Sequence, residues 1–324
     1  MRKLIYIAAI VLSLLFVGYV LLFHGQEQGF SLASLTSDES IILFQIRLPR
    51  LAIGFLVGGG LALSGYLLQH ITNNSLADPY LLGTSGGASL GANLVISGVA
   101  FGGVTLLNVA FGALLMATIV TVVLLILATE KGHVNVFKLL LGGVSITSMC
   151  GALNALLIYL VNDQSKVAEI VFWSMGSLSR AKWDVAILIA ICLLLSIVVI
   201  TIYSKELMMM LVGHQKAKVL GMNVEQFKWV VISISTILTS VSVAFTGPVG
   251  FVGLFVPHFI RAVYGVAGRF NVIFVVLTGG VFLVVCDAIG KLLYAPIGLP
   301  IGVVTALIGV PFFVWLVVKS DYKF

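Results

Sequence analysis

The chain contains few charged residues. Asp, Glu, Lys and Arg make up 9% of its 324 residues, whereas hydrophobic residues make up 60%, and the mean hydropathy is +1.18. This composition excludes an ordinary soluble domain. Apolar runs of about 20 residues have the length of a helix that crosses a bilayer, and the alternating pattern of a membrane β-barrel does not recur. We therefore predict an all-α integral membrane protein.

Cysteine is also scarce, and the motifs of enzymes are missing. Cys150, Cys192 and Cys286 lie in apolar runs, and we predict that they are buried thiols rather than a disulfide framework. The sequence has no HExxH metal motif, no G-x-S-x-G elbow and no G-x-x-x-x-G-K-[ST] phosphate loop. We expect no enzymatic activity, no cofactor and no metal site in this chain. The net charge of +6 comes from basic residues in loops and does not indicate nucleic-acid binding.

Hydropathy predicts ten membrane spans in a single polytopic domain, residues 1–324. The first span is expected to be retained rather than cleaved as a signal peptide, because its apolar run is long and no A-x-A-like site follows it. The eighth span contains Pro257, His258 and Arg261. The predicted spans cover residues 4–23, 51–70, 80–98, 105–128, 138–161, 185–203, 229–246, 251–267, 270–290 and 301–318.

The basic residues predict how these spans are oriented. With both termini inside, twelve of the 18 Lys and Arg residues fall on the inner side, which favours a cytoplasmic N-terminus and C-terminus. In this arrangement the four-helix units that begin at the second and seventh spans run in opposite directions. An inverted repeat of this kind is common in transporters.

Residues 204–228, SKELMMMLVGHQKAKVLGMNVEQFK, form the central stretch that is best suited to meet water. Gly213 and Gly221 bracket a segment of about two helical turns, and Gly221 suits its C-terminal end. Asn223 and Gln226 have the spacing of a helix N-cap and its third residue. We predict two short helices at the cytoplasmic surface, followed by a new span. Composition leaves open whether this stretch is a solvated loop or a docking element for another protein.

Other features also leave two interpretations open. The Gly- and Pro-rich segments 246–258 and 295–302 predict broken helices, which either border a path through the bundle or are simple kinks. Asp287 is expected to bond a neighbouring helix end. Arg47 and Arg50, three residues apart before the second span, suit either an acidic partner or lipid headgroups.

Taken together, an ordered set of motifs resembles the FecCD/BtuC-like permease family of ABC importers for iron–siderophore complexes, haem and vitamin B12. The resemblance covers about residues 45–318. The matching stretches are RLPRLAIGFLVGGGLALSGYLLQ (47–69), SLADPYLLGTSGGASLGA (75–92), FWSMGSLS (172–179), LGMNVEQ (220–226), GPVGFVGLFVPHFIR (247–261) and LPIGVVTALIGVPFF (299–313).

The resemblance implies a type II ABC importer permease fold of about ten transmembrane helices in the bacterial cytoplasmic membrane. It further implies a second permease protomer, identical or related, two ATPase subunits that bind ATP and magnesium, and an extracytoplasmic substrate-binding protein. Its implied function is inward transport of an iron–siderophore complex, haem or cobalamin. The alternative is a secondary transporter driven by an ion gradient, against which the shortage of carboxylates in mid-membrane speaks.

The resemblance also implies site residues. Docking of the binding protein is expected at Arg47, Arg50 and Lys291, the last of which is usually Arg in the family. Coupling to the ATPase is expected within the motif that begins at Gly213, where His214 replaces the usual acidic residue. The remaining coupling residues are Ala217, Lys218, Leu220 and Gly221. The residues expected to line the path and its gate are Asn135, Val136, Phe137, Gly142, Gly143, Ser145 and Ser148.

Overall fold

The computed structural model describes residues 18, 40–100, 105–265, 270–294 and 298–319. Helices make up most of these ranges, and the described residues form a single sheet of two short strands. Six of the described helical segments are long and apolar enough to cross a membrane. The first predicted span, residues 4–23, lies outside the described residues except for Gly18.

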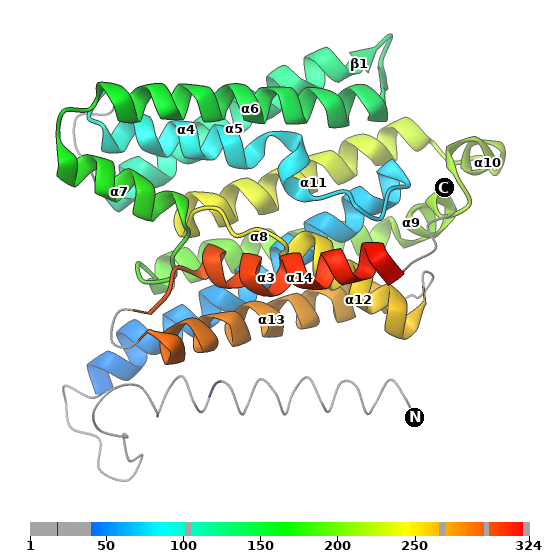
Figure 1. The fold of residues 1–324 in the computed structure, drawn as a ribbon. Coiled ribbons are helices and arrows are strands. Elements are labelled where there is room, and N and C mark those ends of the chain that lie inside the picture. The colour runs from blue at the N-terminus through cyan, green and yellow to red at the C-terminus, as the bar shows by residue number, and fades with distance from the viewer. Residues whose placement is uncertain (1–17, 19–39, 101–104, 266–269, 295–297, 320–324) are drawn as a thin grey trace.

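The elements follow one another along the chain as Figure 1 shows. They are η1 (Ile42–Arg47), α3 (Leu48–Thr72), η2 (Pro79–Leu82), α4 (Thr84–Ile96), α5 (Leu106–Ala128), β1 (Thr129–Glu130), β2 (His133–Val134), α6 (Val136–Leu160), α7 (Gln164–Ser174), α8 (Trp183–Ile202), α9 (Ser204–Met210), α10 (His214–Val219), α11 (Val224–Thr246), α12 (Val252–Tyr264), α13 (Asn271–Leu293) and α14 (Ile301–Lys319).

The chain contains two four-helix units of matching design. The helices α3 to α6 form the first unit, and α11 to α14 form the second. The second helix of each unit, α4 or α12, has 13 residues, and the third, α5 or α13, has 23. Each 13-residue helix starts after a residue of positive φ, Gly83 at 73° or Phe251 at 68°. The helix α3 starts at the end of the bundle where α7 lies, whereas α11 starts at the α10 end (Figure 1), as an inverted repeat requires.

Glycines on α3 bring the two units into close contact. A Cβ at Gly58 would overlap the backbone carbonyl of Gly279 on α13, and a Cβ at Gly65 would overlap that of Gly253 on α12. Small residues at these positions let helix backbones approach where no side chain fits between them. The helix α3 is therefore the centre of the bundle: in the most apolar 18-residue stretch of the helical segment Ile42–Thr72, 78% of the residues are buried. In the corresponding stretch of α6, 17% of the residues are buried.

Several predicted boundaries were wrong. The third span was predicted to run from residue 80 to 98, but α4 covers Thr84–Ile96 because Gly83, with its left-handed backbone, separates it from the 3₁₀ turn η2. The helix of the seventh span, α11, begins at Val224, before the apolar run at 229–246, and the Asn223 side chain accepts a hydrogen bond from Gln226 N at 3.1 Å, which confirms the predicted N-cap. The helix α7 was not predicted. Its start is fixed by Asp163, whose side chain accepts from Ser165 N.

Candidate functional site

At the α7 end of the bundle, charged side chains of α3 and α13 meet. Arg50 Nε lies 2.9 Å from Asp287 Oδ2, and Arg50 Nη2 lies 2.7 Å from Oδ1, so the guanidinium donates two parallel hydrogen bonds to the carboxylate. Lys291 Nζ lies 3.8 Å from the same carboxylate. The Asp287 side chain is 5% exposed, whereas those of Arg50 and Lys291 are 18% and 30% exposed. Two cations thus share one buried anion, and the cluster keeps a net positive charge.

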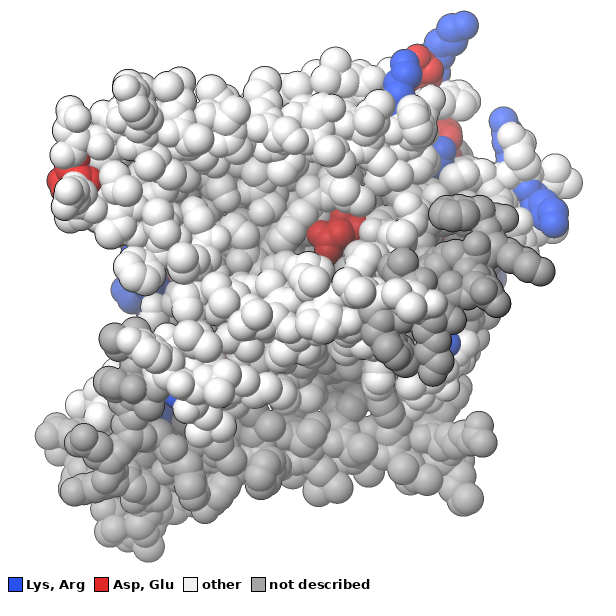
Figure 2. Space-filling model, in the orientation of Figure 1, with Lys and Arg blue, Asp and Glu red and all other residues white. Residues whose placement is uncertain are grey.

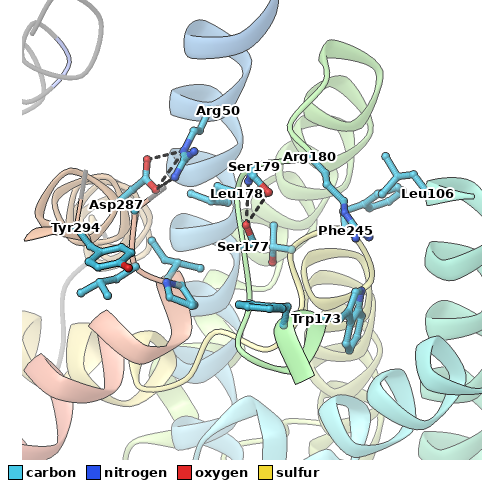
Figure 3. A pocket seen from close by; sticks show the side chains of 17 residues that line it. Arg50, Leu106, Trp173, Ser177, Leu178, Ser179, Arg180, Phe245, Asp287 and Tyr294 are labelled. Atoms are coloured by element: carbon cyan, nitrogen blue, oxygen red, sulfur yellow. Dashed lines mark hydrogen bonds and ion pairs between the residues drawn. The ribbon is translucent and has the colours of Figure 1, made fainter. Parts of the chain in front are cut away.

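A cavity of about 530 Å³ lies beside this cluster. Figure 3 shows Arg50 and Asp287 on one side of the cavity and Arg180 on another, with the aromatic side chains of Trp173, Phe245 and Tyr294 around it. Arg180 is paired with Glu169 at 3.2 Å. The cavity therefore combines an aromatic, largely apolar wall with cationic groups at its rim.

The structure thus brings together two of the three residues predicted to dock a binding protein. Arg50 and Lys291 meet at Asp287, which confirms that this carboxylate bonds a neighbouring helix end. Arg47 is the last residue of η1, one helical turn before Arg50, and is partly buried. Docking itself stays a prediction for all three.

The breaks between helices border a second cavity. The segment between α11 and α12 is not helical at Pro248 and Val249. The Tyr80 hydroxyl bonds the main chain of Val249, because it donates to Val249 O at 2.9 Å and accepts from Val249 N at 2.7 Å. An apolar cavity of about 690 Å³ lies against this segment and α14. The Gly- and Pro-rich stretch 246–258 therefore contains the predicted break between helices, with an open cavity beside it; a path through the bundle stays a prediction.

The helix α6, predicted to line the path, has a wide exposed face. Ser145 and Ser148 are exposed, and Phe137 at the start of the helix is 72% exposed. Gly142 and Gly143 instead face the bundle, where a Cβ would meet Leu124 and the backbone carbonyl of Leu81, respectively. Asn135 and Val136, both partly buried, start α6, and the Asn135 side chain accepts hydrogen bonds from Phe137 N and Lys138 N.

The hairpin before α6 lies at the α10 end of the bundle. Its strands pair antiparallel with Thr129 opposite Val134, and Lys131 and Gly132 both have positive φ, as a tight hairpin turn requires. Lys138 forms an exposed ion pair with Glu130, and its hydrogen bond and charge lower the pKa of the Glu130 carboxyl. The buried Lys228 Nζ donates to Val134 O at 3.1 Å, and Val134 N donates to Glu225 at 2.8 Å.

The predicted coupling stretch contains the two expected short helices, α9 and α10. Gly213 and Gly221 flank α10 with φ of 94° and 85°, which confirms both as its boundaries. His214 Nε2 lies 2.8 Å from the carbonyl oxygen of Ile71, so this imidazole bonds the C-terminal end of α3. Ala217 is buried within the chain.

The exposed residues of α10 and its end combine polar and apolar side chains. Lys218 is exposed, and Val219 and Leu220 are 88% and 62% exposed. Sequence reasoning missed Val219, although its place next to Leu220 at the end of an isolated, lysine-containing helix was a usable signal. Figure 2 shows basic side chains concentrated at this end of the molecule, while the face between the two ends is nearly uncharged apart from an acidic patch near its middle.

These observations define a class: a multi-span α-helical membrane protein with broken helices beside cavities and an exposed surface helix at one end. The sequence model of the FecCD transport family matches residues 5–319, and the chain belongs to this family. It is therefore an ABC transporter permease and not an enzyme, because its relatives are the membrane subunits of such transporters.

Three comparisons illustrate the relationship. The chain is 35% identical to the cobalamin import system permease protein BtuC of Halobacterium salinarum, over 87% of this chain and 75% of that protein. It is 35% identical to the hemin transport system permease protein HmuU of Yersinia pestis, over 86% of this chain and 84% of that protein. A solved inward-facing structure of a metal-chelate type ABC transporter superposes with a TM-score of 0.86 at 28% identity, covering 99% of this chain and 100% of that one.

Proposed function

We propose that this permease carries a large metal chelate inward across the cytoplasmic membrane, with ATP hydrolysed on two separate ATPase subunits. An iron–siderophore complex is our first candidate, and haem and cobalamin are the alternatives. The named relatives support chelates of this kind, since their names specify hemin and cobalamin. A gradient-coupled secondary transporter is not favoured, because the chain belongs to a family of ABC permeases.

The observation that carries this proposal is the exposed helix α10 at one end of a bundle that has no phosphate loop of its own. An exposed apolar pair, Val219 and Leu220, beside lysines is suited to enter a groove on another protein. We assign the α10 end to the cytoplasm, with both termini, and the α7 end to the outside. Coupling then takes place at Gly213, His214 and the following residues of α10, as the family resemblance implies.

At the outer end, the cationic cluster is the proposed docking surface for a substrate-binding protein. Arg47, Arg50 and Lys291 present positive charge around Asp287, which is complementary to carboxylates on a partner. A second permease protomer, identical or related, is proposed to face the exposed side of α6, so that the two copies enclose the path. The hydroxyl groups of Ser145 and Ser148 each bond a carbonyl of their own helix, which leaves a weakly polar wall along which a large ligand can move.

Reconstitution tests the proposal. The permease is coexpressed with its ATPase and binding protein, purified as a complex and inserted into liposomes that contain ATP. Uptake of radiolabelled ferric siderophore, haemin and cyanocobalamin is then measured beside a complex whose ATPase is inactivated by mutation. We expect uptake of one chelate that requires active ATPase. Uptake that continues with the inactive ATPase and stops with an uncoupler would instead establish gradient coupling.

A further inference from the structure

One residue of the hairpin, Val134, is held through both of its main-chain groups by side chains of α11. Val134 N donates to Glu225 Oε2 at 2.8 Å, and Val134 O accepts from Lys228 Nζ at 3.1 Å. The same Lys228 Nζ donates to Glu225 Oε1 at 2.8 Å. The three bonds form a closed ring, here called the Val134 clasp, between residues that are more than ninety positions apart in the chain.

The clasp is protected from water. The Lys228 side chain is 8% exposed, the Glu225 side chain is 26% exposed, and Val134 is 3% exposed. A buried ammonium group is stable only where it is paired and hydrogen-bonded, so Lys228 needs both of its partners. In contrast, the ion pair between Glu130 of the same hairpin and Lys138 of α6 has side chains that are 57% and 46% exposed, and such surface pairs contribute little.

The clasp lies between the exposed helix α10 and the start of α6. On one side, Met222 N donates to Ala217 O at 3.1 Å, which joins α10 to the turn before α11. On the other side, Val134 is followed directly by Asn135, which caps α6 by accepting from Phe137 N. A displacement of α10 would therefore reach α11, pass through the clasp to the hairpin and arrive at the first turn of α6.

We propose that Glu225 and Lys228 are positioning residues of the transport cycle, which make the inner end of α6 follow the movements of α10. This inference rests on the proposed function, since it requires an ATPase that moves α10. Without the clasp, α10 can still dock its partner, but the hairpin and Phe137 no longer move with it. ATP hydrolysis is then uncoupled from the movement of the gate, so it continues while the inner end of α6 stays in place.

The test uses a cysteine reporter at Phe137, which is 72% exposed. Cys150, Cys192 and Cys286 are replaced by alanine, and the Phe137→Cys permease is assembled with its ATPase in lipid nanodiscs. The rate of maleimide labelling is measured without nucleotide and after trapping with ATP and vanadate. We expect the two rates to differ by about tenfold, as for a gate that switches between two states.

The clasp is removed by the double substitution Glu225→Ala/Lys228→Met, which leaves no unpaired buried charge. We expect the labelling rates with and without nucleotide to differ by less than about twofold, while ATPase copurification and vanadate trapping persist. The matched control is Glu130→Ala/Lys138→Met, which removes an exposed ion pair between the same hairpin and α6 and should keep the full difference in labelling rate. A merely structural clasp would lower copurification and trapping as well.

The outcomes separate this inference from the proposed function. If the clasp variant keeps the tenfold difference, the inference is overturned while the proposed function stands. The proposed function fails, and the inference with it, if the permease with an intact clasp does not bind an ATPase. The same holds if its rate of maleimide labelling is equal with and without nucleotide. Should this double variant not assemble, Glu225→Leu/Lys228→Leu decides: it removes the same two bonds to Val134 and leaves no buried charge, while its larger side chains fill more of the vacated space, and a full tenfold difference in it would also overturn the inference.

Discussion

Arg50 and Asp287 join the first helix of one four-helix unit to the third helix of the other at the α7 end of the bundle. At the α10 end, Glu225 and Lys228 at the start of α11 hold Val134, which follows the third helix of the first unit. The inverted repeat makes these two connections equivalent in position. Each lies just before the last helix of a unit, α14 or α6, so each mouth of the proposed path has one charged connection between the units.

The first prediction concerns the connection at the α7 end. Asp287→Ala should lower the stability of the permease by about 3 kcal/mol, because it leaves Arg50 and Lys291 partly buried without their anion. The measurement is thermal unfolding of the purified permease in nanodiscs. The double variant Arg50→Met/Asp287→Leu should be less destabilised than Asp287→Ala, since it removes the main cation together with its partner.

A matched control for Asp287 is Glu169, which pairs with Arg180 at the same end of the bundle. The Arg180 and Glu169 side chains are 43% and 34% exposed, and exposed pairs contribute about 0–1 kcal/mol. Glu169→Gln should therefore leave the unfolding temperature almost unchanged. If Asp287→Ala and Glu169→Gln lowered the unfolding temperature equally, burial of the Asp287 carboxylate would not determine its contribution to stability.

The second prediction concerns the helix contacts of α3. Gly65→Ala should prevent correct folding or reduce stability by several kcal/mol, because its Cβ would overlap the backbone of Gly253, which cannot move aside without shifting α12. Gly60→Ala on the same helix is the control, since the nearest atom to its Cβ, Leu238 Cδ2, is 3.7 Å away. Yield of monodisperse protein and unfolding temperature report the difference. Similar behaviour of the two variants would contradict the close approach of α3 and α12.

Much of the fold was predictable from local patterns. Apolar runs predicted nine helices that the described residues contain, of which six are long and apolar enough to cross a membrane. Asn223 and Gly221 marked the ends of helices because capping is chemistry between neighbouring residues. The start of α4 was missed, since the run of apolar and small residues around Gly83 contains no proline or charged residue to mark the break. The helix α7 was missed because its partly exposed, mixed sequence has no long apolar run.

The site was predictable in its members but not in its connections. The family resemblance brought Arg50 and Lys291 together, yet their common partner Asp287 lies 237 positions from Arg50, and no local pattern relates residues so far apart. The Val134 clasp was missed for the same reason. Glu225 and Lys228 were visible as charges at the start of a helix, but only the packed bundle shows that they hold the main chain of the hairpin.

The third prediction distinguishes two residues of the coupling stretch. Val219→Asp should reduce copurification of the ATPase by about tenfold, because it places a charge on an exposed apolar contact without changing the interior of the permease. Ala217→Leu should also reduce copurification, but through loss of permease stability, since Ala217 is fully buried within the chain.

Unfolding temperature separates the two effects on copurification. The Val219→Asp permease should unfold at the temperature of the unmodified protein, whereas the Ala217→Leu permease should unfold at a lower one. Normal copurification of the ATPase with Val219→Asp would place the contact elsewhere on the 204–228 stretch.

The fourth prediction concerns the outer docking surface. Arg47→Glu should raise the dissociation constant of the substrate-binding protein by about tenfold at low salt and by less at high salt, because salt screens the charge on this exposed end of the protein. Arg50 is not used, because its replacement would break the bond to Asp287. Lys205→Glu, an equal charge change on the exposed surface of α9, should leave docking unchanged. Surface plasmon resonance on nanodiscs at two salt concentrations measures all three constants. If Arg47→Glu and the unmodified permease bind equally at low salt, the side chain of Arg47 contacts lipid headgroups rather than the binding protein.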